Sequence, residues 1–498
     1  GRVNTPELDR DDAPDHAPAG RGRTGLTLIA SLLAAALLLA GCATPGALPQ
    51  APAALTPAEL GARAVAVDWP QRDWWATWGD PELAALVARA LDGQPALQAV
   101  QARLRQAEAA VAMADAARGP QLTGSVALTD QRYSENGLVP APLAGSVQWS
   151  NDAQLGASWE LDLFGRQRAA LDAAIGQWRA GQADAQAARQ LLASNIALGW
   201  VQLGRLIDTR GVAQRALAQR EQVLALVRQR IGAGLDTTVE LRQAEGTIAQ
   251  SKVELEALDE AIARARHALA ELSGQRPDAL DAAAPTLAAL TPAPRLDGLP
   301  VDLVGRRADL VAQRWRVEAA MRGVDVAKAQ FHPNVDLKAF VGLSSLGLDR
   351  FVRAGSLTYG AGPALHLPIF DGGRLRAQLQ SSQAEVDAAI DGYNASLLRA
   401  LREVADEIGS LQSLQRQQAA QAEALAAAES AFDLSVQRYR AGLGNFLIVL
   451  TAEANVLAQR RAGTDLSARQ RAAELALIKA LGGGYDDTDT TLAAQAPR

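Results

Sequence analysis

The chain has 498 residues, of which 49 are basic and 55 are acidic, so its net charge of -6 gives no indication of nucleic-acid binding. Its single cysteine, Cys42, excludes an intramolecular disulfide and a metal site built on cysteines. Aromatic residues make up only 4% of the chain. Long stretches consist of Ala, Leu, Gln, Arg and Glu, which are strong helix formers, so we expect a mainly helical protein with long helices.

The sequence of residues 1–41 is typical of a secretory leader. Arg21 and Arg23 precede an apolar run at 26–40, which is shorter than the roughly 20 residues that a membrane-spanning helix needs. The sequence Leu-Ala-Gly-Cys that ends at Cys42 resembles the lipobox of bacterial lipoproteins. We therefore expect residues 1–41 to be removed, and Cys42 to carry a diacylglycerol and an N-acyl lipid. An uncleaved short anchor is the alternative, and residues 1–20 are read as a start-site artefact or an extended leader.

Two halves of the chain repeat each other. The segment 96–120 aligns without a gap with 309–333, and both segments end in proline. The sequence "LDLFGRQRAAL" (161–171) matches "LPIFDGGRLRAQL" (367–379), and Arg-x-x-Ala-Gly-Leu occurs at 230–235 and again at 438–443. A repeat of about 210 residues is too long for a solenoid unit and indicates a duplicated half-protein.

Each half contains the same order of elements. A helix at 96–118 or 309–331 is followed by two segments in which apolar and polar residues alternate, which predicts strands at 121–129 and 153–163, then at 334–344 and 357–367. Their length suits tilted strands that cross a membrane. Helical stretches at 165–231 and 374–440 follow, and helices at 235–273 and 444–481 return after a glycine-containing turn. In each half, the two shorter helices stacked end to end match the length of the long one.

These elements give a division of the chain. We expect a leader (1–41), an N-terminal lipid-anchored and equatorial segment (42–95), a first repeat (96–274), an equatorial linker (275–308), a second repeat (309–482) and a flexible tail (483–498). The loops at 130–152 and 345–356 are predicted to lie outside the cell, as the longer loops of membrane barrels do. Four strands by themselves leave two edges unpaired, which a bilayer does not tolerate.

The chain resembles the TolC-like outer-membrane efflux factors, in particular the OprM/NodT-type lipoprotein branch. The matching residues are the lipobox, "WWATWGDPEL" at 74–83, "LDLFGR" at 161–166, both Ala-Gly-Leu turns and "ALGGG" at 480–484. The resemblance implies a mainly α protein in the outer membrane. Three chains would form a 12-stranded barrel and a helical tunnel through the periplasm. It also implies a periplasmic adaptor and an inner-membrane transporter of the RND type as partners.

Two sites follow from this resemblance. The tip turns would dock the adaptor through Gly232, Gly234, Leu235, Gly442, Leu443 and Gly444. The alternative is a simple helical turn, whose geometry alone would explain the glycines. Asp433, Gln437 and Arg438 would narrow the periplasmic aperture, unless they belong to a solvated helix face.

The sequence gives little support for an enzymatic function. The histidines His16, His267, His332 and His366 lack metal-ligand spacing, and there is no P-loop or G-x-S-x-G motif. We expect no catalytic residue, no metal and no cofactor beyond the lipid. Trp69, Trp74, Trp75 and Trp78 could form a carbohydrate platform, but we expect them to pack the N-terminal segment around the helices. The expected function is passive export of solutes such as drugs. The alternatives are the channel of a type I protein secretion system and a structural lipoprotein without a pore.

Overall fold

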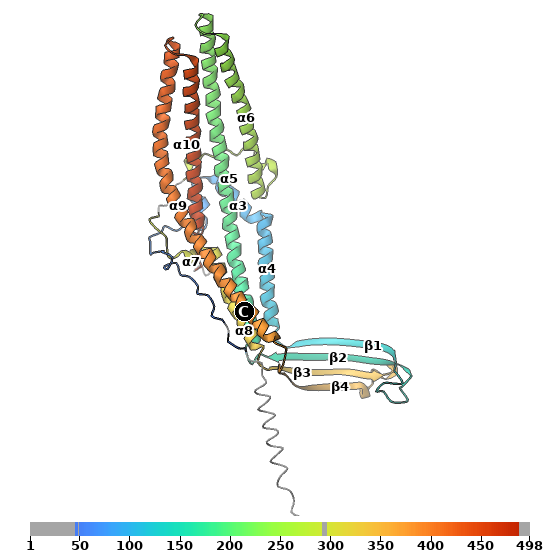
Figure 1. Cartoon of the computed structure of the whole chain (residues 1–498). Coiled ribbons are helices and arrows are strands. Elements are labelled where there is room, and N and C mark those ends of the chain that lie inside the picture. The colour runs from blue at the N-terminus through green and yellow to red at the C-terminus, as the bar shows by residue number, and fades with distance from the viewer. Residues whose placement is uncertain (1–44, 48, 291–295, 488–498) are drawn as a thin grey trace, which may run out of the picture. The chain divides into compact units, whose positions relative to one another are not determined.

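The computed structural model describes residues 45–47, 49–290 and 296–487, and it divides into two compact units (Figure 1). The strand unit contains Leu122–Phe164 and Ala327–Gln380, whereas the helical unit contains Pro49–Gln121, Gly165–Val326 and the chain from Ser381 onward. The predicted leader and the lipid-attachment residue Cys42 lie outside the described residues.

The strand unit is one four-stranded sheet in the order β1-β2-β3-β4. Its strands are β1 (Gln121–Arg132), β2 (Val147–Leu161), β3 (Asn334–Leu346) and β4 (Leu357–His366). The first loop, predicted at 130–152, is therefore only 133–146, and the second is 347–356. The alternation ends before the strands do, because the polar residues at 150–152 pair with residues 344–346 of β3 and so extend the ladder.

The two faces of this sheet differ as the alternation predicts. One face carries exposed apolar side chains on every strand: Leu122, Val126, Leu128, Leu155, Trp159, Leu337, Val341, Leu357, Tyr359 and Leu365. The other face is mostly polar but includes Phe340. Its register partners on both neighbouring strands, Gly156 and Gly360, have no side chain, which leaves room for the ring.

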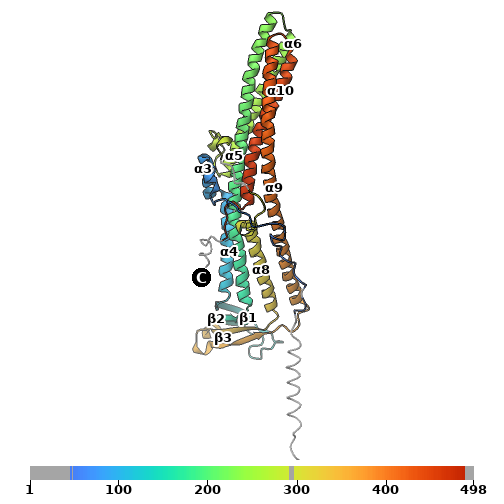
Figure 2. The same cartoon turned by 90° about the vertical axis from the view of Figure 1, so that its left-hand side faces the viewer.

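The helical unit is built on two long hairpins, which stand side by side in both views (Figures 1 and 2). The long helices α5 (Arg166–Gly232) and α9 (Arg374–Arg440) have 67 residues each. They turn back into α6 (Thr238–Leu272) and α10 (Phe446–Ala480), each of 35 residues. The stretch at 444–450 thus begins a helix and is not a buried strand. The other helices are α2 (Trp74–Thr77), α3 (Pro81–Gly93), α4 (Pro95–Ala116), α7 (Leu303–Arg306) and α8 (Ala308–Ala329).

Gln94 joins α6 to α4 end to end. Its side-chain oxygen accepts from Ala96 N at 3.0 Å, which caps the first turn of α4. Its amide donates to Glu271 O at 3.0 Å and to Leu272 O at 3.3 Å, the last carbonyls of α6. One side chain thus satisfies backbone groups at two helix ends, which would otherwise lack partners. This contact confirms the predicted stacking of the two shorter helices in the first half.

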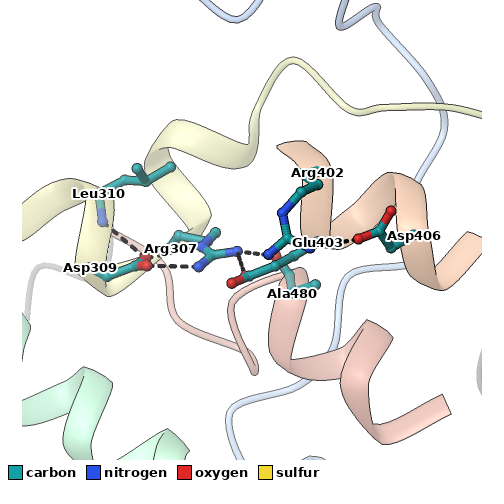
Figure 3. Close-up of polar contacts among 7 residues, drawn as sticks. All are labelled: Arg307, Asp309, Leu310, Arg402, Glu403, Asp406 and Ala480. Atoms are coloured by element: carbon teal, nitrogen blue, oxygen red, sulfur yellow. Dashed lines mark hydrogen bonds and ion pairs between the residues drawn. The ribbon is translucent and has the colours of Figure 1, made fainter. Parts of the chain in front are cut away.

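Arg307 makes the equivalent junction in the second half, between α10 and α8 (Figure 3). It stands 213 residues after Gln94, at the same position of the repeat. Its Nη1 donates to Ala480 O at 3.3 Å and to Glu403 of α9 at 2.7 Å, and its other nitrogens hold Asp309 at 2.7 and 3.0 Å. Burial would lower the pKa of Arg307, but the bonds and charges of the two carboxylates keep the pKa above its usual value.

The segment after α10 is closely packed. Gly482 has φ +95°, and a Cβ at this residue would lie only 1.7 Å from Arg306 O. A Cβ at Gly484 would lie 2.1 Å from Gln71 O, and Asp487 N donates to Gly305 O at 3.1 Å. The prediction of a flexible tail from residue 483 is therefore wrong for 483–487, because these residues fit against the backbone of two other segments, at Gln71 and at Gly305.

The N-terminal segment lies along the helices, as the packing interpretation predicts. Trp74, Trp75 and Trp78 are buried, and the ring of Trp74 meets those of the other two edge to face at 5.6 and 6.1 Å. Rings buried in this way cannot present a carbohydrate platform. Further along, Asn394 of α9 accepts from Leu55 N at 2.8 Å and donates to Ala53 O at 3.0 Å. Among the described helices, none combines the length and apolarity needed to cross a membrane.

Candidate functional site

The two Ala-Gly-Leu turns at the hairpin tips are helix C-caps of the Schellman type. In the first, Leu235 N donates to Arg230 O and Gly234 N to Ile231 O, both at 2.9 Å. In the second, Leu443 N donates to Arg438 O at 2.8 Å and Gly442 N to Tyr439 O at 3.0 Å. This bonding pattern needs a left-handed residue after the helix, and Gly234 and Gly442 have φ +73° and +76°. Gly232 and Gly444 do not have positive φ values, so the turn does not need glycine there.

The leucine that completes each turn is exposed. Leu235 and Leu443 keep 63% and 70% of their surface, and Val239, Leu447 and Ile448 are also exposed in the first turns of α6 and α10. Polar caps at Thr237 and Asn445 begin these two helices. The tips therefore combine a fixed backbone with a group of solvent-facing apolar side chains.

Directly behind the tips, three side chains connect the hairpins. Arg230 binds Asp236 through Nε at 2.8 Å and Nη2 at 3.2 Å, and its Nη1 donates to Tyr439 O at 2.7 Å. The Tyr439 hydroxyl donates to Asp236 Oδ2, and the guanidinium lies 4.4 Å from the centre of the tyrosine ring. We call Arg230, Asp236 and Tyr439 the tip clasp. It ties the α5–α6 turn to the last turn of α9.

The contacts of the tip clasp shift the pKa values of Asp236 and Tyr439 in the directions that favour the hydrogen bond between them. Burial would raise the pKa of Asp236, but the hydrogen bonds from Arg230 and Tyr439 and the Arg230 charge keep the pKa below its usual value. Burial and the bond to Asp236 raise the pKa of Tyr439. At neutral pH the carboxylate therefore accepts hydrogen bonds and the phenol donates one, as the contact requires.

The duplication shows why this clasp exists in one copy only. Arg230 corresponds to Arg438, and Asp236 corresponds to Gly444. Because the second turn lacks the carboxylate, Arg438 is exposed and makes a long hydrogen bond to Leu443 O at 3.4 Å. Sequence reasoning missed Arg230, Asp236 and Tyr439. The aspartate at one turn, where the other has glycine, was the available signal.

The predicted aperture residues lie together on α9. Asp433, Gln437 and Arg438 are all exposed, whereas Phe432 and Tyr439 on the same helix are buried. The aperture assignment stays a prediction.

Further from the tips than the clasp, Arg220 of α5 joins three helices. Its Nε binds the buried Glu453 of α10 at 3.1 Å, and its Nη1 donates to Thr247 O at 3.1 Å and Ser251 Oγ at 2.6 Å on α6. Burial raises the pKa of Glu453, while the Arg220 charge and hydrogen bond act in the opposite direction. Thus each long helix is held to its neighbours at several levels along its length.

The part of the chain that the structure describes contains no cluster of three potential metal ligands. His267 is exposed near the C-terminal end of α6, and the ring of His332 stacks on Phe164 at 4.6 Å. Neither histidine is placed as a metal ligand.

Comparison with known proteins agrees with this architecture. The family model for the outer membrane efflux protein matches residues 86–275 and 299–483. The chain belongs to the outer membrane efflux protein family. The two matched segments correspond to the two halves of the duplication. The chain is thus an outer-membrane protein of an efflux channel family, and it forms the exit channel of an efflux system.

Similar proteins include the fusaric acid resistance protein FusA of Burkholderia cepacia, at 39% identity over 74% of this chain and 71% of FusA. The multidrug resistance outer membrane protein MdtP of Shigella flexneri is 31% identical over 92% of this chain and 96% of MdtP. Among solved structures, the outer membrane protein VceC of Vibrio cholerae has a TM-score of 0.78 and 36% identity, covering 84% of this chain and 100% of VceC.

Proposed function

We propose that this exit channel is a homotrimer that belongs to a tripartite pump and passively releases drug-like solutes. The two edge strands, β1 and β4, support the oligomer, since an open sheet cannot remain in a bilayer with unpaired edges. The names of FusA and MdtP refer to resistance to fusaric acid and to multiple drugs, which favours small organic solutes over secreted proteins. An inner-membrane transporter of the RND type would supply the energy.

The observation that carries this proposal is the pair of exposed apolar tips backed by the tip clasp. A periplasmic adaptor that covers Leu235 and Leu443 would gain the free energy of burying two leucines, up to about 1.5–3 kcal/mol each. Binding there would also act directly on the turn that contains Asp236. The tips would thus serve both for docking and for opening.

Charged substitutions at the tips test this function. Leu235→Glu and Leu443→Glu leave the glycines and the cap hydrogen bonds in place, but they place a charge where the adaptor must exclude water. Drug export by cells that carry the double variant should fall to the level of a strain without the channel, while the amount of trimer in the outer membrane stays unchanged. Leu398→Glu, at an exposed site far from the turns on α9, is the matched control. Normal export by the double variant would contradict adaptor docking at the tips.

For the aperture, we propose that three copies of Asp433 surround the periplasmic entrance with Gln437 and Arg438. Like charges near one axis would attract cations and repel anions. Asp433→Ala should therefore reduce cation preference in planar bilayers, and Asp433→Glu should preserve it. Unchanged ion selectivity in both variants would place Asp433 on the outer surface.

For the anchor, we propose that Cys42 carries the diacylglycerol and N-acyl lipid. In that case Cys42→Ser should prevent both lipid attachment and cleavage before residue 42, and mass spectrometry of the mature chain measures both. An unmodified Cys42 in the mature parent chain would contradict the proposal.

A further inference from the structure

The two edges of the sheet are exposed and nearly equal in length. β1 has 12 residues and β4 has 10, and neither has a second neighbouring strand within the described chain. Phe370, just after β4, keeps 90% of its surface exposed. The proposed homotrimer offers each edge a partner of known sequence, namely the opposite edge of the next copy. The open question is which residues face each other across that seam.

The internal duplication provides a template for the seam. β2 ends the first half's strand pair and β3 begins the second, and the two strands pair antiparallel. In a ring of copies, β4 also ends a pair and the next copy's β1 begins one. β4 therefore takes the role of β2, and β1 takes the role of β3.

The known register can then be transferred residue by residue. In the template, Trp159 faces Leu337. Trp159 lies five positions before Phe164, and the residue five positions before the corresponding Phe370 is Leu365. Leu337 lies 213 positions after Gly124, which is the offset of the gapless alignment. Leu365 of one copy should therefore face Gly124 of the next.

We propose that β4 of one chain pairs antiparallel with β1 of a second copy in this register, from Leu357 opposite Arg132 to His366 opposite Thr123. The inference rests on the homotrimer of the proposed function and adds the arrangement of its seam. All ten residues of β4 then face residues that lie within β1. A shift by two residues toward the loops would push the end of β4 beyond Arg132.

The faces of the strands agree with this register. Directly opposed residues point to the same side of a sheet, and a slip by one residue reverses the side. In the proposed register, Ala361 and Leu365 face Leu128 and Gly124, which belong to the apolar set of β1. On the other face, Ala364 meets Ser125 and Thr358 meets Gln131. The seam thus continues both faces of the sheet from one copy to the next.

Disulfide trapping tests the register in the full-length chain. Ala364→Cys with Ser125→Cys introduces two thiols at small residues of the polar face. Within one chain these residues lie on the two outer strands, three strand spacings or about 14 Å apart, so they cannot form an intramolecular disulfide. Oxidation of isolated membranes should convert most of this variant into reducible cross-linked dimers and trimers. Each single variant controls for reactions of Cys42.

Neighbouring pairs provide the matched controls. Ala364→Cys combined with Thr123→Cys or Ala127→Cys moves one thiol by two residues on the same face, and both combinations should give much less cross-linked product. If the first set does not fold, a second set on the apolar face replaces it. There, Ala361→Cys with Leu128→Cys is the expected pair, and Ala361→Cys with Val126→Cys or with Asp130→Cys is the shifted control.

The outcomes separate the seam from the proposed function. Mass measurement without oxidant reports whether the parent chain and the variants are trimers. A trimer that cross-links best through a shifted pair, or through none of these pairs, overturns the register and leaves the exit channel intact. A parent chain that never forms a trimer overturns the proposed homotrimer, and the seam with it.

Discussion

Tyr439 is the residue on which the connection between the two tips depends. Its hydroxyl binds Asp236, its backbone oxygen accepts from Arg230, and its ring lies against both Arg230 and Phe446. Only the hydroxyl contact can be removed without creating a cavity. It therefore offers a clean way to loosen the tip.

We expect Tyr439→Phe to weaken the tip clasp, because Asp236 loses a donor in a half-buried site. The loss of one hydrogen bond to a charged group costs about 1.5–3 kcal/mol. The channel in a planar bilayer should then show a larger or more frequent open conductance than the parent. Tyr393→Phe makes the same change on α9 far from the tips and should leave conductance unchanged. Equal conductance in all three proteins would show that the clasp does not restrain the tip.

Gly482, just after the end of α10, is a residue at which the close packing of the backbone can be tested. Gly482→Ala should destabilise the protein, since its left-handed backbone alone costs about 1–3 kcal/mol for a residue with a Cβ, and this Cβ would overlap Arg306 O. The thermal loss of helical circular dichroism in detergent measures the effect. Gly463→Ala, in α10 where a Cβ meets open space, should be neutral or stabilising by about 0.5–1 kcal/mol. A similar midpoint for both variants would contradict the packing described here.

At the scale of the elements, a few arginines each bind side chains or backbone groups of several helices. Arg307 joins α8, α9 and α10, and Arg220 joins α5, α6 and α10. Exposed pairs such as Arg264 and Glu260 lie within one helix and contribute little. Arg307 and Arg220 therefore each link three neighbouring helices.

Arg220→Ala should cost about 3–5 kcal/mol, because it leaves Glu453 buried without its ion partner. Replacing both residues, by Arg220→Met and Glu453→Leu, should restore much of the stability. Arg264→Ala is the exposed control and should change the free energy of unfolding by about 0.5 kcal/mol or less. The measurement is again thermal unfolding in detergent. A double variant that is less stable than Arg220→Ala would show that the charge pair itself stabilises the bundle.

At the scale of the whole molecule, the proposed function places the hairpin tips and the strand loops in different compartments. The loops at 133–146 and 347–356 should face the exterior, whereas the tips should face the periplasm. Four exposed apolar side chains of similar size mark these places: Leu138, Val352, Leu235 and Leu443.

Single cysteine substitutions at these four positions test the orientation. In intact cells, a membrane-impermeant thiol reagent should label Leu138→Cys and Val352→Cys but not Leu235→Cys or Leu443→Cys. All four should react once the outer membrane is permeabilised, and the parent chain controls for Cys42. Labelling of the tip variants alone in intact cells would require the opposite orientation.

The sequence by itself determined the order, type and approximate length of the elements, because these depend on local periodicity and on comparison of the two halves. Strand ends were less predictable, since residues 150–152 join the ladder only through their partners on β3. Comparison of the two turns located Gly234 and Gly442, which the caps require for a local reason. The stacking of α6 on α4 could be predicted from length alone, but not the role of Gln94 in holding it.

Only the tertiary structure decided the contacts between segments far apart in the chain. Asp236 and Tyr439 are separated by more than two hundred positions, and no local pattern marks them as partners. The close fit of Gly482 against Arg306 likewise exists only because α10 ends beside the start of α8. Periodicity records which face of each element is buried, whereas the identity of the buried neighbour depends on how the elements pack, and that information is not local.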